Sequence, residues 1–318
     1  MKQRPFGATG LTVSEIGFGT AGLGALFGRQ SRAEQLRTLQ RALDLGINFY
    51  DSADMYCQGE SEKLIAAAFR GRRDQVVIAT KVGYQLPAQR RLISKVKPMI
   101  KPVVSRLGLK REQLPTSVRG SLSQNFSTGY ILKAAEQSLK RLNTDYIDVY
   151  QLHSPPRPVL ESGEFLEPLE MLKRQGKIRY VGVSCEVADD ALICLRYQEL
   201  SALQLRLNLL DQAALQHAIP AASQRGWAII ARECFAGGRL FHPMDAVHQS
   251  TATSQPTERP APEDQVTAYR AQAALESASL PQLALRFVLD INEVSVAILG
   301  MSSEDHLMAN LGSICAVQ

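Results

Sequence analysis

Short apolar runs recur along the chain, and longer segments with apolar residues at every third or fourth position lie between them. Short runs of apolar and β-branched residues predict strands. Eight are expected, at Ile16–Thr20, Asn48–Ser52, Val76–Val82, Tyr146–His153, Tyr180–Ser184, Ala202–Asn208, Trp227–Glu233 and Val294–Gly300. Because these runs are apolar at nearly every position, we expect parallel strands that are buried on both faces.

The segments between the strands are amphipathic and predict helices. They are expected at Ser31–Leu45, Ser61–Arg70, Gly129–Leu142, Phe165–Gln175, Asp189–Leu200, Gln212–Arg225 and Leu283–Asp290. A glycine that can end a helix in the left-handed conformation follows four of these patterns, at Gly46, Gly71, Gly176 and Gly226. Repeated strand–helix units in a chain of 318 residues predict an α/β fold, a (β/α)8 TIM barrel, as a single domain over residues 1–318.

Two further features are expected around the barrel. Residues 4–6 and 11–13 flank the turn Gly7–Gly10 and predict an N-terminal β-hairpin. A long insertion follows the third strand, at residues 84–126, and a segment rich in Ser, Thr, Pro and Gln, residues 243–263, is expected to be a mobile loop.

A doubly wound dinucleotide-binding sheet is the alternative to the barrel. That fold places a Gly-x-Gly-x-x-Gly turn after its first strand, and residues 17–22 match this string. One match to so short a pattern is weak support, and eight regular units exceed what a doubly wound sheet requires. The number of units therefore favours the barrel.

The insertion at residues 84–126 is strongly basic. It carries nine lysine and arginine residues against the single acid Glu112, whereas the whole chain has a formal charge of +5. Apolar residues are interleaved with the cations over Leu92–Leu109. Three interpretations stay open: a solvated amphipathic helix on the barrel rim, a lid that attracts an anionic substrate or cofactor, or a contact surface for an anionic membrane or partner.

Composition excludes several classes of protein. Hydrophobic residues make up 45% of the chain, as in a globular protein rather than a disordered or fibrous one. No apolar signal segment or membrane-length run is visible, so a cytoplasmic protein without a membrane span is expected. The five cysteines have no zinc spacing or C-x-x-C pairing, which predicts free thiols and no metal. The modest overall charge predicts no nucleic-acid partner, and it leaves the oligomeric state open.

Four polar residues lie near the C-terminal ends of three neighbouring predicted strands. Asp51 is near the end of the second strand with Tyr56 in the loop that follows, Lys81 is near the end of the third, and His153 ends the fourth. Active sites of this barrel lie at that rim. Each residue alone has a structural explanation, but an unpaired ammonium in an apolar strand is costly, and Asp51 is a suitable partner for Lys81.

These four side chains suit the reduction of a carbonyl group. A tyrosine has a pKa of about 10, and the Lys81 ammonium is expected to lower the pKa of Tyr56. The phenol would then act as an acid in reduction and the phenolate as a base in oxidation. His153 would orient the substrate oxygen with a hydrogen bond.

The sequence resembles the aldo-keto reductase superfamily over essentially its whole length. The resemblance is carried by Ile16–Thr20, Gly46–Tyr56, Gly59–Glu62, Ala79–Lys81 and Gln151–His153. It implies an NAD(P)(H)-dependent oxidoreductase that reduces an aldehyde or ketone to an alcohol, or catalyses the reverse, on a small-molecule substrate. It also implies that Asp51, Tyr56, Lys81 and His153 are the catalytic residues, with Tyr56 as the general acid.

The same resemblance implies a set of cofactor-binding residues. Ser184 and Gln204 would hold the nicotinamide amide, the loop over residues 237–240 would cover the pyrophosphate, and residues 300–310 would bind adenosine. The full set is Gly19, Thr20, Asp51, Ser184, Gln204, Arg232, Gly237, Gly238, Arg239, Leu240, Gly300, Ser302, Ser303, His306 and Asn310.

The chain departs from the family's common pattern at two informative positions. Arg232 replaces an aromatic residue that often stacks on nicotinamide, and we expect its cation to disfavour the oxidised, positively charged ring. Ser302 stands where many NADPH-dependent members have a cation that binds the 2′-phosphate. NADP(H) is nevertheless favoured over NAD(H), because the family commonly uses it.

Two alternatives to a redox enzyme remain. The first is a cofactor-binding regulatory or partner protein on the same barrel with little turnover, which the fold alone does not exclude. The second is a membrane- or polyanion-binding module built on the basic insertion.

Overall fold

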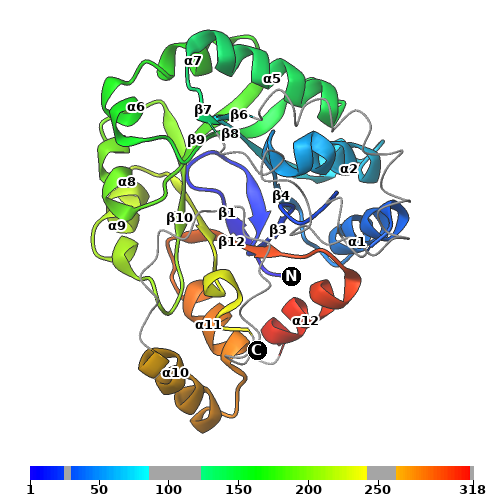
Figure 1. Cartoon of the computed structure of the whole chain (residues 1–318), viewed down its shortest axis with the longest axis vertical. Coiled ribbons are helices and arrows are strands. Elements are labelled where there is room, and N and C mark those ends of the chain that lie inside the picture. The colour runs from blue at the N-terminus through cyan, green and yellow to red at the C-terminus, as the bar shows by residue number, and fades with distance from the viewer. Residues whose placement is uncertain (25–29, 86–122, 242–262, 316–318) are drawn as a thin grey trace, which may run out of the picture.

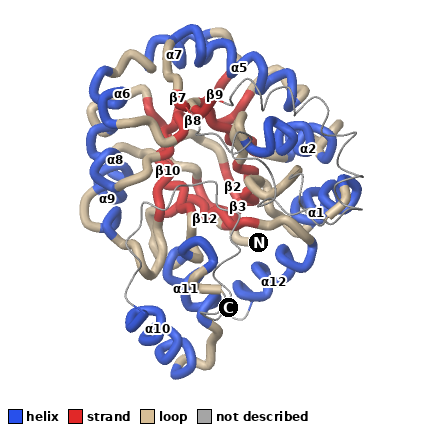
Figure 2. The backbone as a smooth tube through the Cα atoms, in the orientation of Figure 1, coloured by secondary structure: helices blue, strands red, loops and turns tan. Residues whose placement is uncertain are grey.

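The computed structural model contains a closed barrel of eight parallel strands (Figures 1 and 2). Around the barrel the order is β3-β4-β5-β8-β9-β10-β11-β12, and β12 pairs with β3 to close it. The strands are β3 Ile16–Gly19, β4 Phe49–Asp51, β5 Val77–Val82, β8 Ile147–His153, β9 Ile178–Ser184, β10 Leu200–Arg206, β11 Ala228–Arg232 and β12 Val294–Gly300. The predicted TIM barrel is therefore confirmed, and each expected strand lies within two residues of an observed one.

Helices form a ring around the strands (Figure 1). They are α1 Arg32–Asp44, α2 Glu60–Ala68, α5 Thr128–Leu142, α6 Arg157–Ser162, α7 Leu166–Arg174, α8 Ala188–Cys194, α9 Ala218–Gln224, α10 Glu263–Leu275, α11 Leu280–Leu289 and α12 Glu304–Cys315. Short 3-10 helices lie at Tyr56–Gly59, Arg73–Gln75, Ala213–Leu215 and Ala236–Gly238. No helix in the described part of the chain is both long and apolar enough to cross a bilayer.

The structure describes residues 1–24, 30–85, 123–241 and 263–315. Most of the basic insertion, including the predicted helix Leu92–Leu109, lies outside these residues. Its two ends are described and pair as an antiparallel hairpin, β6 Tyr84–Gln85 with β7 Ser123–Gln124. The expected mobile loop at 243–263 also lies outside the described residues, except that its last residue, Glu263, begins α10.

Alternation along the strands separates an inner face from an outer face. The inner residues near the strand starts form an apolar cluster that contains Phe49, Val149 and Ala228. Two positions further along the same strands come Asp51 and Gln151. Because side chains two residues apart point to the same side of a strand, the barrel interior is apolar at its N-terminal end and polar at its C-terminal end.

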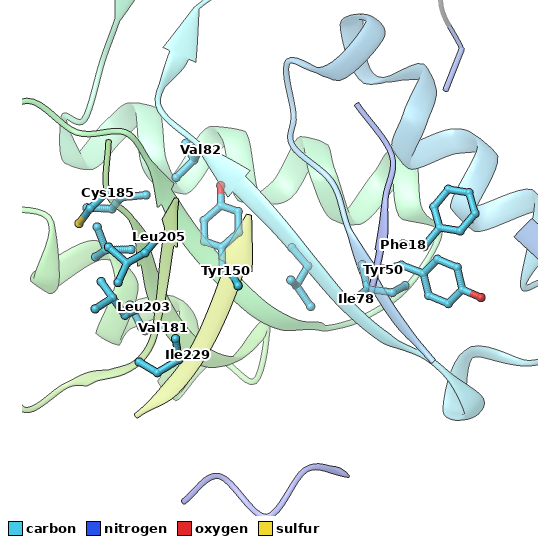
Figure 3. Packing of buried hydrophobic residues seen from close by; sticks show 14 of the residues in the cluster. Phe18, Tyr50, Ile78, Val82, Tyr150, Val181, Cys185, Leu203, Leu205 and Ile229 are labelled. Carbon is cyan, nitrogen blue, oxygen red and sulfur yellow. The ribbon is translucent and has the colours of Figure 1, made fainter. Parts of the chain in front are cut away.

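The outer faces of the strands pack against the ring of helices. Tyr50, Ile78 and Tyr150, which alternate with the inner residues, are almost fully buried and belong to the largest hydrophobic cluster (Figure 3). The same cluster contains Leu39 of α1 and Leu139 of α5. The strands are thus buried on both faces, as their continuous apolar runs predict.

The N-terminal hairpin closes the apolar end of the barrel. Its strands β1 Gln3–Pro5 and β2 Thr12–Ser14 pair antiparallel, which confirms the prediction. Phe6 is fully buried in the inner apolar cluster, with its ring 5.4 Å from that of Phe49. Gly7 has a φ of +55°, and a Cβ there would lie 2.4 Å from the carbonyl oxygen of Gly226, so this close approach requires glycine.

Gly17 and Gly19, which match the dinucleotide-binding string, have a packing role on β3. A Cβ on Gly17 would lie 2.5 Å from Cδ1 of Ile298, and one on Gly19 would lie 2.9 Å from Cγ2 of the same residue. The string therefore reflects the close contact of β3 with β12, and the doubly wound alternative is wrong.

Helix boundaries differ most from the sequence prediction in two places. The single helix expected at Gln212–Arg225 is a 3-10 turn followed by α9, whose third residue is Pro220. Proline has no N–H for an intrahelical bond and is tolerated only in the first turn, so the α-helix begins there. The helix expected at Asp189–Leu200 ends at Cys194, because Leu200 already belongs to β10.

Candidate active site

A cavity of about 510 Å³ opens at the polar end of the barrel. Asp51, at the end of β4, and His153, at the end of β8, line it, together with Tyr56 from the 3-10 helix that follows β4. Lys81 of β5 lies behind this lining with 1% of its surface exposed. The fold thus brings the four residues predicted as catalytic into one site.

Lys81 and Asp51 form a buried ion pair. The Lys81 Nζ lies 2.6 Å from Oδ2 of Asp51 and donates a second hydrogen bond of 3.0 Å to the carbonyl oxygen of Ser52. Burial alone would lower the pKa of the ammonium, but the Asp51 carboxylate and Tyr56 outweigh it, so the pKa of Lys81 is raised. Lys81 therefore stays charged at neutral pH.

Tyr56 lies between Lys81 and His153. The Lys81 Nζ is 5.2 Å from the centre of the Tyr56 ring, and the His153 ring meets Tyr56 edge to face with centroids 5.7 Å apart. Burial raises the pKa of Tyr56, and the charge of Lys81 opposes that shift without reversing it. The expected net lowering is therefore not observed, and the phenol is protonated at neutral pH, which suits a proton donor.

His153 is held neutral by its surroundings. Burial, followed by the charges of Lys81 and Arg232, places the pKa of His153 well below its usual value. The ring also stacks edge to face on Tyr84, the first residue of β6, with centroids 4.8 Å apart. A neutral imidazole keeps one N–H, which is the donor that the orienting role requires.

A chain of hydrogen bonds joins the predicted nicotinamide residues to the ion pair. The Ser184 hydroxyl donates to Oε1 of Gln204 at 2.9 Å, and Nε2 of Gln204 donates to Oδ1 of Asp51 at 2.9 Å. Thr20 donates to the carbonyl oxygen of Asp51 through both its N–H and its hydroxyl, each at 3.0 Å. The positions of Ser184 and Gln204 are therefore coupled to that of Asp51.

Most residues predicted to bind the cofactor line the same cavity. They are Gly19, Thr20, Asp51, Ser184, Gln204, Arg232, Gly237, Gly238, Gly300, His306 and Asn310. Asn310 lines it from α12 and is 3% exposed. Glycines at 237 and 300 leave open space where a Cβ would lie, so a ligand can approach the backbone there. These features fit a dinucleotide.

Four predicted cofactor residues lie outside the lining: Arg239, Leu240, Ser302 and Ser303. Leu240 is fully buried in an apolar cluster with Ala273 and Leu283. The Ser303 hydroxyl accepts the N–H of His306 at 3.2 Å and so caps the start of α12. Ser302 is 3.1 Å from Nδ1 of His306, which does line the cavity.

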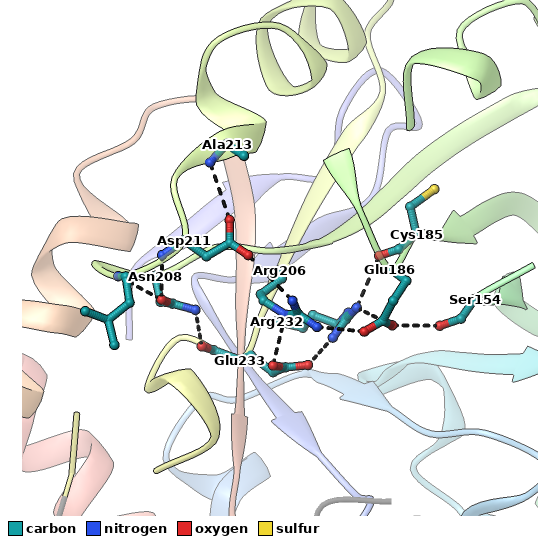
Figure 4. A network of polar contacts seen from close by, with 10 residues as sticks. Ser154, Cys185, Glu186, Arg206, Asn208, Asp211, Ala213, Arg232 and Glu233 are labelled. Atoms are coloured by element: carbon teal, nitrogen blue, oxygen red, sulfur yellow. Dashed lines mark hydrogen bonds and ion pairs between the residues drawn. The ribbon is translucent and has the colours of Figure 1, made fainter. Parts of the chain in front are cut away.

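Arg232 lines the cavity as predicted, but its charge is compensated. Its guanidinium contacts the carboxylates of Glu233 and Glu186, the latter at 2.9 Å (Figure 4). The sequence interpretation treated Arg232 as an isolated cation and did not anticipate these partners. These partners oppose the expected effect of Arg232 on the oxidised ring, which stays a prediction.

Several residues of the site were missed by sequence reasoning, among them Gln151, Glu186 and Tyr84. Gln151 lies 3.5 Å from Oδ1 of Asp51, and Glu186 and Tyr84 line the cavity. The available signal for Gln151 was its amide side chain inside the apolar run of β8. The available signal for Glu186 was its carboxylate, two residues after Ser184. Tyr84 carried none, because only the fold places the start of the insertion against His153.

No group of three or more His, Cys, Asp or Glu side chains suited to a metal occurs among the described residues. Cys57, Cys185, Cys194 and Cys234 are free thiols, as predicted for those four.

Comparison with known proteins agrees with this geometry. The model of the aldo/keto reductase family matches residues 15–317. An NADH-specific methylglyoxal reductase of Escherichia coli is 32% identical over 71% of this chain and 65% of its own length, and a D-threo-aldose 1-dehydrogenase of a Pseudomonas species is 30% identical over 73% and 69%. The holo form of an aldo-keto reductase from Bacillus halodurans superimposes with a TM-score of 0.77 at 28% identity, over 99% of this chain and 91% of that one. The chain therefore belongs to the aldo/keto reductase family of oxidoreductases, which act on carbonyl compounds with NAD(P)(H).

Proposed function

We propose that this protein reduces an aldehyde or ketone to an alcohol, or catalyses the reverse, with Tyr56 as the general acid and base. The observation that carries the proposal is the buried Lys81–Asp51 pair beside Tyr56, with a neutral His153 in the same cavity. A buried ammonium is tolerated only when it is paired, as Lys81 is with Asp51. The same ammonium lies 5.2 Å from the centre of the Tyr56 ring, close enough to stabilise its phenolate.

Each of the four residues has a separate role in reduction. The nicotinamide supplies the hydride when it is bound. Tyr56 transfers its hydroxyl proton to the carbonyl oxygen, and Lys81 stabilises the phenolate that this leaves. Asp51 keeps Lys81 charged and in place, and the N–H of His153 orients the carbonyl oxygen towards Tyr56.

Two ends of the cavity would hold the two halves of the cofactor. At the catalytic end, Ser184 and Gln204 would bind the nicotinamide amide, beside the four catalytic residues. At the adenosine end, His306 and Asn310 line the cavity and Ser302 lies beside His306. None of these three residues is the lysine or arginine that would pair strongly with a 2′-phosphate, so use of NADP(H) in preference to NAD(H) stays a prediction.

The substrate side of the cavity combines aromatic and charged groups. Tyr84, Phe235 and Phe241 line it together with Glu186 and Arg232. Such a surface suits a small carbonyl compound with an apolar part and hydroxyl groups. The two enzymes named above act on methylglyoxal and on an aldose, and we include both substrate types in the screen.

The direct test is a parallel titration and turnover assay on the purified protein. Binding of NADPH and NADH is followed by fluorescence, and consumption of the tighter binder is then followed with methylglyoxal, aldoses and simple aldehydes and ketones. We expect micromolar binding and consumption that requires a carbonyl. Tight binding with no turnover of any carbonyl would instead favour a cofactor-binding partner protein, and binding of neither cofactor would overturn the proposal.

A further inference from the structure

Charged side chains at or just after the ends of three strands form a network (Figure 4), and three of its members, Glu186, Arg232 and Glu233, line the cavity. Arg232, at the end of β11, contacts Glu233 through its Nη1. Its Nη2 contacts Glu186 at 2.9 Å and the carbonyl oxygen of Cys185 at 3.2 Å. Arg206, at the end of β10, contacts the same two carboxylates, Glu186 at 2.6 Å and Glu233 at 3.1 Å. The two arginines are thus held by one shared pair of carboxylates.

The backbone is strained where two members of this network are presented. Glu233 has a φ of +56° and Ser154, whose hydroxyl is 3.3 Å from Glu186, has a φ of +47°. A residue other than glycine in this region costs on the order of 1 kcal/mol or more and persists where the surroundings enforce it. Both strained residues directly follow strands, β8 and β11, and both contact the network around Glu186 and Arg232.

The network faces the reacting centre. Glu186, Arg232 and Glu233 all line the cavity that contains Tyr56 and His153. The charge of Arg232 acts on both of those residues, lowering the pKa of each. A change in the net charge around Arg232 is therefore felt at the catalytic end.

We propose that Glu186 is a positioning residue that fixes the Arg232 guanidinium and cancels its charge beside the nicotinamide site. This inference rests on the proposed function, because it concerns the ring that Ser184 and Gln204 would hold. The oxidised ring carries a positive charge and the reduced ring is neutral. An uncompensated guanidinium would weaken binding of the oxidised form selectively, and with Glu186 in place the two forms bind comparably.

Substitution Glu186→Gln tests the proposal, since it preserves the shape and removes the charge. Dissociation constants of the oxidised and reduced forms of the preferred cofactor are measured by fluorescence and by calorimetry. The dissociation constant of the oxidised form, divided by that of the reduced form, is expected to rise roughly tenfold. This is the size of effect expected from one unit charge near a partly buried site. This ratio reports charge at the ring and does not depend on turnover.

Two further variants make the test specific. Arg232→Gln alone should lower the ratio, because it leaves the negative charge of Glu186 beside the cavity without the positive charge of Arg232. Adding Glu186→Gln in that background should return the ratio to the wild-type value within about twofold, because the charges of both residues are then gone. Asp211→Asn is the matched control: Asp211 lies 3.6 Å from Arg206 in the same network, and its ion pairs in the described part of the chain do not include Arg232. We expect the ratio in Asp211→Asn to equal that of the wild type.

The outcomes separate the inference from the function on which it depends. If wild-type protein binds neither cofactor form, the proposed function fails. If it binds both, and Glu186→Gln weakens both equally, or the double variant keeps the raised ratio of Glu186→Gln, the compensating role of Glu186 is wrong. Thermal unfolding of each variant shows whether equal weakening reflects loss of folded protein.

Discussion

The two ends of the cavity are built in different ways. At the catalytic end, strand-borne side chains that are almost fully buried hold one another, from Lys81 through Asp51 and Gln204 to Ser184. At the proposed adenosine end, Ser302 is partly exposed and lies in the loop before α12. His306 is exposed and lies in the first turn of that helix. On the proposed function, folding therefore fixes the catalytic geometry, whereas cofactor selectivity would depend on a surface that can change at little cost in stability.

The largest effect should come from removing the cation of the buried pair. Lys81→Met leaves the Asp51 carboxylate without its main partner, and breaking a buried pair in this way costs about 3–5 kcal/mol. We expect that loss in the free energy of unfolding measured with urea. The double variant Lys81→Met with Asp51→Asn should recover part of it, and no recovery would mean that the pair is not the cause.

A second effect concerns Asp54, whose N–H donates to the carbonyl oxygen of Lys81 at 3.1 Å. Burial, reinforced by Glu62 and opposed by Arg141, raises the pKa of Asp54 to about 8, and its Oδ1 is buried without a hydrogen-bond partner. An unfolded aspartate titrates near 3.8. Between pH 3.8 and about 8, Asp54 is protonated in the folded protein and ionised in the unfolded chain. The free energy of unfolding therefore falls as the pH rises through this range.

Asp54→Asn should remove that pH dependence, because an amide cannot ionise. At pH 5 we expect the variant to match the wild type within about 1 kcal/mol. At pH 9 it should be more stable by about 4 kcal/mol, since each of the roughly three pH units between 5 and a pKa of about 8 removes about 1.36 kcal/mol from the wild type. Urea unfolding at both pH values measures the difference. If the variant and the wild type differ in unfolding free energy by the same amount at pH 5 and pH 9, the raised pKa of Asp54 is contradicted.

Ser302→Arg tests the adenosine end. A guanidinium beside His306 can pair with a 2′-phosphate, and we expect NADPH to bind at least tenfold more tightly, about 1.4 kcal/mol, with NADH binding little changed. Parallel fluorescence titrations measure both constants. A gain for both cofactors alike would show that the new side chain does not reach the 2′ position.

The smallest effect is expected at the cap of α12. Ser303→Ala removes the hydroxyl that accepts the His306 N–H, and loss of such a cap costs about 1 kcal/mol. Urea unfolding should show this local cost, well below that of Lys81→Met. A loss as large as that of Lys81→Met would mean that the two ends are equally integrated into the core.

The sequence predicts the parts of this molecule that depend on local pattern. Periodicity locates the eight strands, and position at the strand ends brings Asp51, Lys81 and His153 together. The pattern could not reveal that Arg232 pairs with Glu186, because Glu186 follows β9, which is distant in sequence and is separated from β11 by β10 in the barrel. Its other partner, Glu233, is the next residue and was an available signal. The pKa of Tyr56 was misjudged for a similar reason: the charge of Lys81 was visible in the sequence, but the burial that outweighs it was not.

The central claim, proton transfer from Tyr56 at a catalytic end fixed by folding, is tested most directly by single-turnover reduction with Tyr56→Phe. Reduced cofactor is bound first, a carbonyl substrate of the wild-type protein is added, and oxidation of the cofactor is followed by absorbance. We predict a rate at least about 10³-fold below the wild type, within the range for loss of a general acid, with the cofactor dissociation constant unchanged within twofold. A rate within tenfold of the wild type, at equal cofactor occupancy, would contradict the assignment of Tyr56 as the proton donor.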